Sequence, residues 1–213
     1  MKRENTLLSK LNEASDWLIR VVVINLLMIA TALPIVTLYA SLHAGYRLMH
    51  DYANQDETPL FKGYFKYWWE GLPKKIWLGL LFIVFGGLTV LNVTYYVDII
   101  RENPQALYVI GYYVTIAAMV GLYIILIHSF SCMLVFPNLR VTKLFKLSFY
   151  LSGKYFLRTS LLVVIHLASM LMLMTPITQF MFVFIGLSLP MLVNAIMTRP
   201  IVSYLESLGE KRG

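Results

Sequence analysis

Residues 17–52 read WLIRVVVINLLMIATALPIVTLYASLHAGYRLMHDY, and this stretch decides how the rest of the chain is laid out. It is apolar almost throughout, with Pro34 near its middle and Arg47 near its end. One continuous helix would cross a bilayer once, whereas two helices meeting at Pro34 would cross it twice. Proline lacks a backbone N–H and pushes the preceding residue away from the α region, so we expect a helix break here.

The composition indicates a membrane protein. Of the 213 residues, 59% are hydrophobic and 14% are charged, and the mean hydropathy is +0.69. Soluble domains are about a quarter charged. Residues 103–139 and 159–198 contain no charge, and each run exceeds the roughly 20 residues that span a bilayer. We therefore predict an all-α fold, a polytopic transmembrane helical bundle.

The distribution of Lys and Arg decides between five and six crossings. With five crossings, the 18 cationic residues would divide 13 to 5 between the two sides of the membrane. With a reversal at Pro34 there are six crossings, and the division becomes 17 to 1, with Arg101 alone on the far side. Cytoplasmic loops carry the excess of Lys and Arg, so the pattern favours six crossings with both termini in the cytoplasm.

The prediction is one integral membrane domain over residues 1–213. The predicted spans cover residues 17–33, 36–52, 76–97, 106–136, 159–174 and 177–198. Two further segments, residues 60–72 and 142–155, combine aromatic, apolar and basic residues at helical spacing. We predict that both are amphipathic helices at the membrane interface, since Trp and Tyr favour the headgroup level.

No motif for catalysis, metal binding or a cofactor is present. The chain lacks the G-x-x-x-x-G-K-[ST] phosphate loop, H-E-x-x-H, G-x-S-x-G and any Cys/His cluster with metal-ligand spacing. We expect no enzyme activity, no catalytic residues, and no metal or cofactor. The net charge of +7 fits attraction to anionic lipid headgroups. Nucleic-acid binding is not expected, because there is no basic soluble domain.

A set of polar residues lies within or near the predicted spans. Each of them could simply form a hydrogen bond across a pair of helices. Alternatively, the three histidines of the set, on three different helices, could line a cavity that binds a solute or moves a proton. The candidate set is Asn25, His43, Arg47, Asn92, His128, His166 and Asn194.

Residues 25–81, NLLMIATALPIVTLYASLHAGYRLMHDYANQDETPLFKGYFKYWWEGLPKKIWLGLL, resemble the YesL family of bacterial membrane proteins. The shared pattern is Leu-Pro-x-Val-Thr after the first span, here Leu33, Pro34, Val36 and Thr37, then a return helix rich in small residues and an aromatic-basic segment. The Gly-Pro that often follows Thr in that family is replaced by Leu38-Tyr39. The resemblance implies a multi-pass protein of the plasma membrane of Gram-positive bacteria, but no catalytic residues.

The same resemblance implies a role beside carbohydrate ABC importers. The leading expectation is a non-enzymatic accessory protein of carbohydrate uptake that docks against importer subunits or another membrane partner, with self-association as a further option. The alternative is a small solute or lipid transporter that uses the polar set as its pathway. In either case the lipid bilayer is its first partner.

Overall fold

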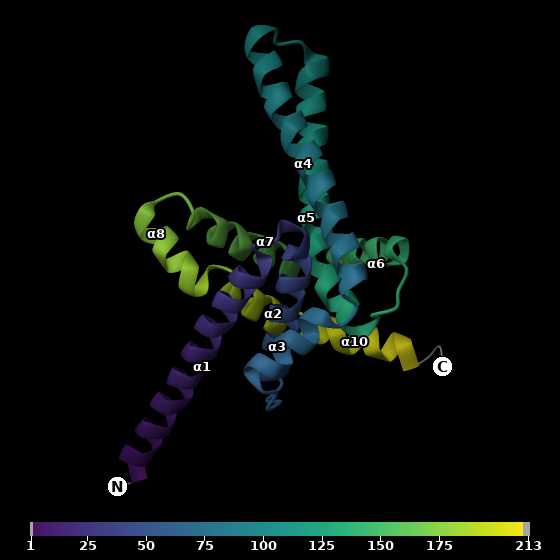
Figure 1. The fold of residues 1–213 in the computed structure, drawn as a ribbon. Helices are drawn as coiled ribbons and strands as arrows, with labels where there is room; N and C mark the ends of the chain where they lie inside the picture. The colour runs from purple at the N-terminus through teal and green to yellow at the C-terminus, as the bar shows by residue number, and fades with distance from the viewer. Residues whose placement is uncertain (1, 211–213) are drawn as a thin grey trace. The chain divides into compact units, whose positions relative to one another are not determined.

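The computed structural model describes the backbone of residues 2–210 and the side chains of residue 12 and residues 14–210. Every regular element in this part of the chain is helical, which confirms the predicted all-α class. In chain order the elements are α1 (Lys2–Ala32), η1 (Ile35–Thr37), α2 (Leu38–Ala53), α3 (Leu60–Trp69), α4 (Leu72–Glu102), α5 (Ala106–Val135), α6 (Val141–Lys154), α7 (Phe156–Leu171), α8 (Pro176–Met181), η2 (Phe182–Gly186), α9 (Ser188–Met197) and α10 (Arg199–Glu210), as drawn in Figure 1.

The contacts group these elements into two compact units, each described by itself. Unit 1 comprises Met1–Leu72 and Val164–Arg199, and unit 2 comprises Pro73–Val163 and Pro200–Gly213. The first unit therefore holds α1, η1, α2 and α3 together with the end of α7, α8, η2 and α9. The second holds nearly all of α4, then α5, α6, the start of α7 and most of α10.

The predicted break at Pro34 is confirmed. Helix α1 ends at Ala32, the single 3-10 turn η1 follows Pro34, and α2 begins at Leu38. Pro34 has φ −73° and ψ 103°, an extended conformation that a helix interior does not contain. Its carbonyl accepts both the backbone N–H and the hydroxyl of Thr37, at 2.7 Å each. The proline thus starts a tight turn instead of a kink in one long helix.

Contacts along the two helices show that the chain reverses direction at this turn. Near the break, the Thr31 hydroxyl of α1 lies 2.9 Å from the hydroxyl of Ser41 in α2. Farther along, a Cβ placed on Gly45 would overlap the sulfur of Met28. At the other end the rings of Trp17 and Tyr52 meet edge to face, with centroids 6.5 Å apart. Contacts between residues at increasing distances on both sides of Pro34 define an antiparallel helix pair.

Helix α3 is amphipathic and packs on this pair. Its Gly63, Tyr64 and Tyr67 are buried, and the Tyr64 hydroxyl lies 2.7 Å from that of Thr31 in α1. Burial raises the pKa of Tyr64 to about 12, so its hydroxyl stays protonated and can donate. The second predicted amphipathic helix, α6, buries Leu144, Ser148, Leu151 and Ser152. Both predicted interfacial segments therefore form helices with one buried face.

In unit 2, α4 and α5 form a hairpin that is held at both ends. Beside the connecting turn, Tyr96 of α4 packs against Gly111 of α5. At the other end, the Lys74 ammonium donates to the carbonyls of Pro137 and Leu139, which follow α5. In the most apolar 18-residue stretch of each helix, only 11% of α4 and 6% of α5 is buried within the protein. Such exposed, apolar surfaces are suited to lipid.

Within the part of the chain that the structure describes, three helical segments could cross a membrane by length and composition: Ala14–Ala32, Leu72–Glu102 and Ala106–Val135. The number rises to five if two bent helix pairs each count as one span: α6 with α7, bent by 103°, and α8–η2 with α9, bent by 48°. The predicted count of six crossings is therefore not confirmed. Helix α2 is one of the six predicted spans but is not among these candidates. It has 16 residues, or about 24 Å at 1.5 Å per residue. The single domain over residues 1–213 stays a prediction.

The close approach of α1 and α2 predicts the effect of a substitution at Gly45. We expect Gly45→Val to lower the free energy of unfolding by about 2 kcal/mol, because Met28 is fully buried and has little space to move. Gly87→Val is the matched control, since nothing lies within 4 Å of a Cβ at that helical glycine. Unfolding midpoints in detergent measure the difference, and equal midpoints for both variants would contradict the described packing.

Candidate functional site

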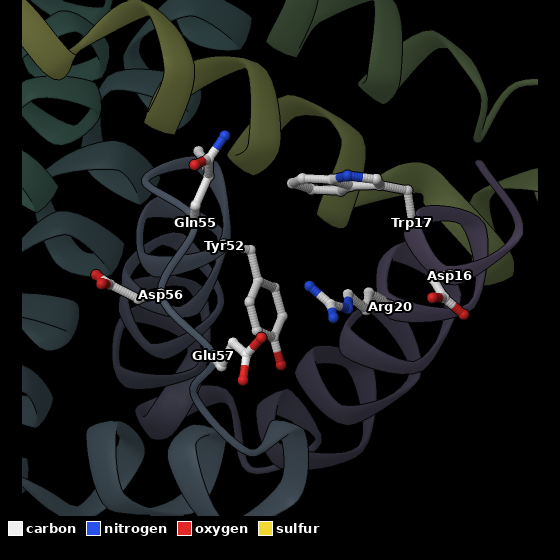
Figure 2. A pocket seen from close by; sticks show the side chains of 8 residues that line it. Asp16, Trp17, Arg20, Tyr52, Gln55, Asp56 and Glu57 are labelled. Carbon is white, nitrogen blue, oxygen red and sulfur yellow. The ribbon is translucent and has the colours of Figure 1, made fainter. Parts of the chain in front are cut away.

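A polar hollow of about 370 Å³ opens in unit 1 between the middle of α1 and the end of α2 (Figure 2). The reversal at Pro34 creates it, because it brings the middle of α1 beside the end of α2. The loop that leaves α2 closes the remaining side. The lining residues are Asp16, Trp17, Arg20, Tyr52, Ala53, Gln55, Asp56 and Glu57.

One cation and two aromatic rings form the interior of the hollow. The guanidinium carbon of Arg20 lies 4.4 Å from the centroid of the Tyr52 ring, and the Trp17 indole meets the same ring edge to face. This is a cation–π arrangement. Among the described residues no carboxylate forms an ion pair with Arg20. Its N–H groups are therefore available to an anionic or polar ligand.

Three of the residues that line the hollow carry a carboxylate. In Figure 2 the Glu57 carboxylate lies beside the hydroxyl end of Tyr52, whereas Asp16 and Asp56 extend outward at the rim. The Tyr52 hydroxyl donates to the Thr58 carbonyl at 3.0 Å, which fixes the ring and the loop together. The hollow thus offers an anionic side and a cationic side within one small space, an arrangement suited to a ligand that carries both charges.

The loop beside the hollow contains a strained residue. Gln55 has φ 67°, in the left-handed region that favours glycine. The N–H groups of Gln55 and Asp56 donate to the carbonyls of Tyr52 and Asp51, which is the Schellman pattern of a helix end. Glycine usually occupies this left-handed position, so glutamine here costs about 1 kcal/mol. Strain of this kind is typical of functional loops.

A cluster of polar side chains fixes the start of the next helix relative to this loop. One carboxylate oxygen of Asp51 accepts the hydroxyls of Tyr67, at 2.6 Å, and of Thr58, at 3.1 Å. Arg47 lies 4.1 Å from the Tyr67 ring centroid and donates to Glu70 at 2.8 Å. Burial, and then the bond to Asp51, raises the pKa of Tyr67, so this hydroxyl stays a donor.

A second hollow, of about 490 Å³, lies on the other side of the same loop. It shares Asp56 and Glu57 with the first and adds Lys62 and Lys66 of α3. The acidic loop therefore separates two spaces, one containing an arginine and the other two lysines. A third hollow of about 430 Å³, mostly apolar, belongs to unit 2 and is lined by residues of α5, α6 and α7.

The seven sequence-predicted residues lie outside these three hollows. Among them, Asn25 is fully buried in α1 and joins it to the break before α9. Its amide nitrogen donates to the carbonyls of Phe182 and Val183, at 3.0 and 2.7 Å. Its oxygen accepts the N–H groups of Leu187 and Ser188, at 2.7 and 2.8 Å. All four bonding positions of this amide are used by the chain itself.

The three histidines are buried in separate helices. His43 in α2 stacks on Tyr39, with ring centroids 6.3 Å apart, and His166 lies in the part of α7 that belongs to unit 1. His128 belongs to unit 2, where its Nε2 lies 2.8 Å from the Thr159 hydroxyl. The shared histidine cavity stays a prediction.

The other members of the set differ in exposure. Asn194 of α9 is fully buried, and its backbone carbonyl accepts the hydroxyl of Thr198 at 2.7 Å. Arg47 joins α2 to the end of α3, as described above. Asn92 lies on the exposed surface of α4. The set therefore contains one exposed amide and several side chains with internal structural contacts.

The residues of the first hollow were not among those predicted from the sequence. One signal could have identified them: Arg20 and Tyr52 lie on opposite sides of Pro34 at comparable distances, so a reversal there pairs them. The position of Glu57 depends on the helix end at Asn54 and Gln55. The sequence does not predict a left-handed residue at Gln55, because the glycine that usually marks such a position is not present there.

Comparison with known proteins gives one match. Residues 21–93 match the family model described as "Protein of unknown function, DUF624". The DUF624 match covers about a third of the chain and contains the Pro34 reversal, α2, α3 and the first part of α4. It also contains the acidic loop of the hollow, while Trp17 and Arg20 directly precede it. No curated protein matches the chain, and neither does any solved structure.

The bonds of Asn25 predict a large effect of its removal. We expect Asn25→Ala to lower the free energy of unfolding by about 3 kcal/mol, since four backbone groups lose the fully buried side chain to which they are bonded. The matched control Asn92→Ala removes an exposed amide and should change stability by less than about 0.5 kcal/mol. Thermal unfolding in detergent compares the two, and an Asn25→Ala midpoint equal to that of the control would contradict a structural role for the four bonds of Asn25.

Proposed function

We propose that this chain is a non-enzymatic accessory protein of carbohydrate uptake in the bacterial plasma membrane. It crosses the membrane six times, keeps both termini in the cytoplasm, and acts by docking against subunits of a carbohydrate ABC importer. The family resemblance motivates the importer as partner. The exposed aromatic face of α3 is the observation that supports docking best.

Two features support six crossings. The contacts of α1 and α2 are antiparallel. If both helices cross the bilayer, the chain returns to the side on which it started, and this layout would keep 17 of 18 cationic residues on one side. Helix α2 is short for a bilayer, but most of its residues are buried by other helices. A helix enclosed by protein tolerates a thickness mismatch at modest cost.

The face of α3 opposite its buried tyrosines supports docking. Phe61, Phe65 and Trp69 follow one another at helical spacing and are 61%, 48% and 69% exposed. Lys62 and Lys66 flank them. Aromatic residues dominate the energetics of protein interfaces, and lysines at the edge of such a face favour an acidic partner surface. The packing of Tyr64 and Tyr67 holds this face in a fixed orientation.

A small solute or lipid transporter is the alternative function. The charged hollow beside Arg20 favours it, since a concave space with a few convergent polar groups is the usual form of a ligand site. Transport would require this hollow to open to each side of the membrane in turn. Flux of a defined solute through liposomes that contain only this protein would favour transport over docking.

Cysteine labelling in intact cells tests the six crossings. In a Cys132→Ala background, we expect a membrane-impermeant maleimide to label Asn103→Cys directly. Gln55→Cys and Asn138→Cys should be labelled only after permeabilisation, because both lie on the cytoplasmic side of the proposed layout. All three positions lie outside the regular helices. Labelling of Gln55→Cys in intact cells would refute the reversal across the bilayer.

Co-purification tests the docking. We expect tagged protein from sugar-induced cells to retain an importer permease, identified by mass spectrometry, and a triple alanine variant of α3 to reduce that subunit at least tenfold. The α3 variant combines Phe61→Ala, Phe65→Ala and Trp69→Ala. The matched control, combining Leu107→Ala, Tyr113→Ala and Val114→Ala, removes similarly exposed side chains of α5. Equal recovery from both variants, or no importer subunit with the unmodified chain, would refute docking through α3.

A further inference from the structure

We propose that the hollow beside Arg20 binds the headgroup of a zwitterionic phospholipid that ends in a primary ammonium, that is, a phosphoethanolamine headgroup. The phosphate contacts Arg20, and the ammonium contacts the carboxylate of Glu57. This inference concerns a site distinct from the α3 face and does not depend on the identity of any docking partner.

Arg20 provides the contact for the phosphate. Its guanidinium rests against the Tyr52 ring at 4.4 Å, so its orientation is fixed before a ligand arrives. Among the described residues it forms no ion pair, and its N–H groups fit the geometry of phosphate oxygens. An arginine already neutralised by a neighbouring carboxylate would not offer this contact.

The ammonium is attracted by the acidic side of the hollow. Glu57 points toward the space beside Tyr52 (Figure 2), and Asp16 and Asp56 add negative charge at the rim. Three carboxylates against one guanidinium disfavour a purely anionic ligand. A ligand with one phosphate and one ammonium matches both sides. The volume of about 370 Å³ lies near the lower limit for ligand pockets and suits a headgroup.

The position of the hollow indicates that the ligand is a lipid and not a soluble zwitterion. It lies at the start of the candidate span Ala14–Ala32, where Trp17 and Tyr52 have the composition of a headgroup-level belt. Leu18 and Ile19, directly beside Trp17 in the chain, are 62% and 57% exposed. These apolar side chains offer a surface on which acyl chains can lie while the headgroup occupies the hollow.

Native mass spectrometry of the full-length chain in detergent tests this site. The probes are phosphatidylethanolamine and phosphatidylglycerol with identical acyl chains. We expect the unmodified chain to bind phosphatidylethanolamine at least tenfold more tightly than phosphatidylglycerol. Glu57→Gln should remove this preference by weakening only the ethanolamine lipid, and Arg20→Gln should weaken both lipids about tenfold.

The controls separate the site from general effects of charge and folding. Arg101→Gln and Glu102→Gln make the same changes at exposed positions of unit 2 and should leave both affinities unchanged. Glu57 lies in an exposed loop, so its variant keeps the test valid even if Arg20→Gln does not fold. Equal binding of the two lipids, or an unchanged preference in Glu57→Gln, would overturn the proposal. Competition by free phosphoethanolamine at the same concentration as the lipid would show that the site binds the soluble headgroup, and would overturn the proposal that its ligand is a lipid.

Discussion

The reversal at Pro34 depends on one constraint: backbone groups freed by a helix break must find partners inside the protein. The Thr37 hydroxyl lies 2.6 Å from the Thr31 carbonyl and 2.7 Å from that of Pro34. The Ser41 hydroxyl accepts from Thr31 and lies 3.0 Å from the Thr37 carbonyl. Three small hydroxylated residues thereby bond both sides of the turn, and their size lets the two helices remain close together.

At the second helix break of unit 1, the freed backbone groups find hydrogen-bond partners in a different way. Between η2 and α9 the helical hydrogen bonds are interrupted, and a single side chain from α1 supplies two donors and two acceptors. The Ser169 hydroxyl of α7 also donates to the Gly186 carbonyl at this place. Because Asn25 is distant in sequence from the break that it bridges, the last helices of unit 1 depend on the first one. A buried amide in an apolar helix can therefore use all its hydrogen bonds to stabilise the fold and need not bind a ligand.

The sequence predicts the helical class, the break and the two amphipathic helices, because each rests on local chemistry. Proline excludes a continuous helix over residues 17–52, and the spacing of aromatic and basic residues defines one face of α3. The bend between η2 and α9 involves a contact distant in sequence. For the same reason, the assignment of His128 to one unit and of His43 and His166 to the other could not be predicted. The first hollow was missed because it requires both the reversal and a left-handed Gln55.

The contact between Arg20 and the Tyr52 ring connects the fold with the candidate site. An arginine one turn into an apolar segment has to reach polar surroundings, and in a single continuous helix it would have only headgroups and water. The reversal gives it an aromatic ring instead, and the loop that follows the Schellman end of α2 places the Glu57 carboxylate beside that ring. The cation is thus held in place by a ring contact and not neutralised by a bonded acid. A guanidinium fixed in this way at the end of a candidate span retains its affinity for phosphate, and this is why the hollow has the properties of a binding site.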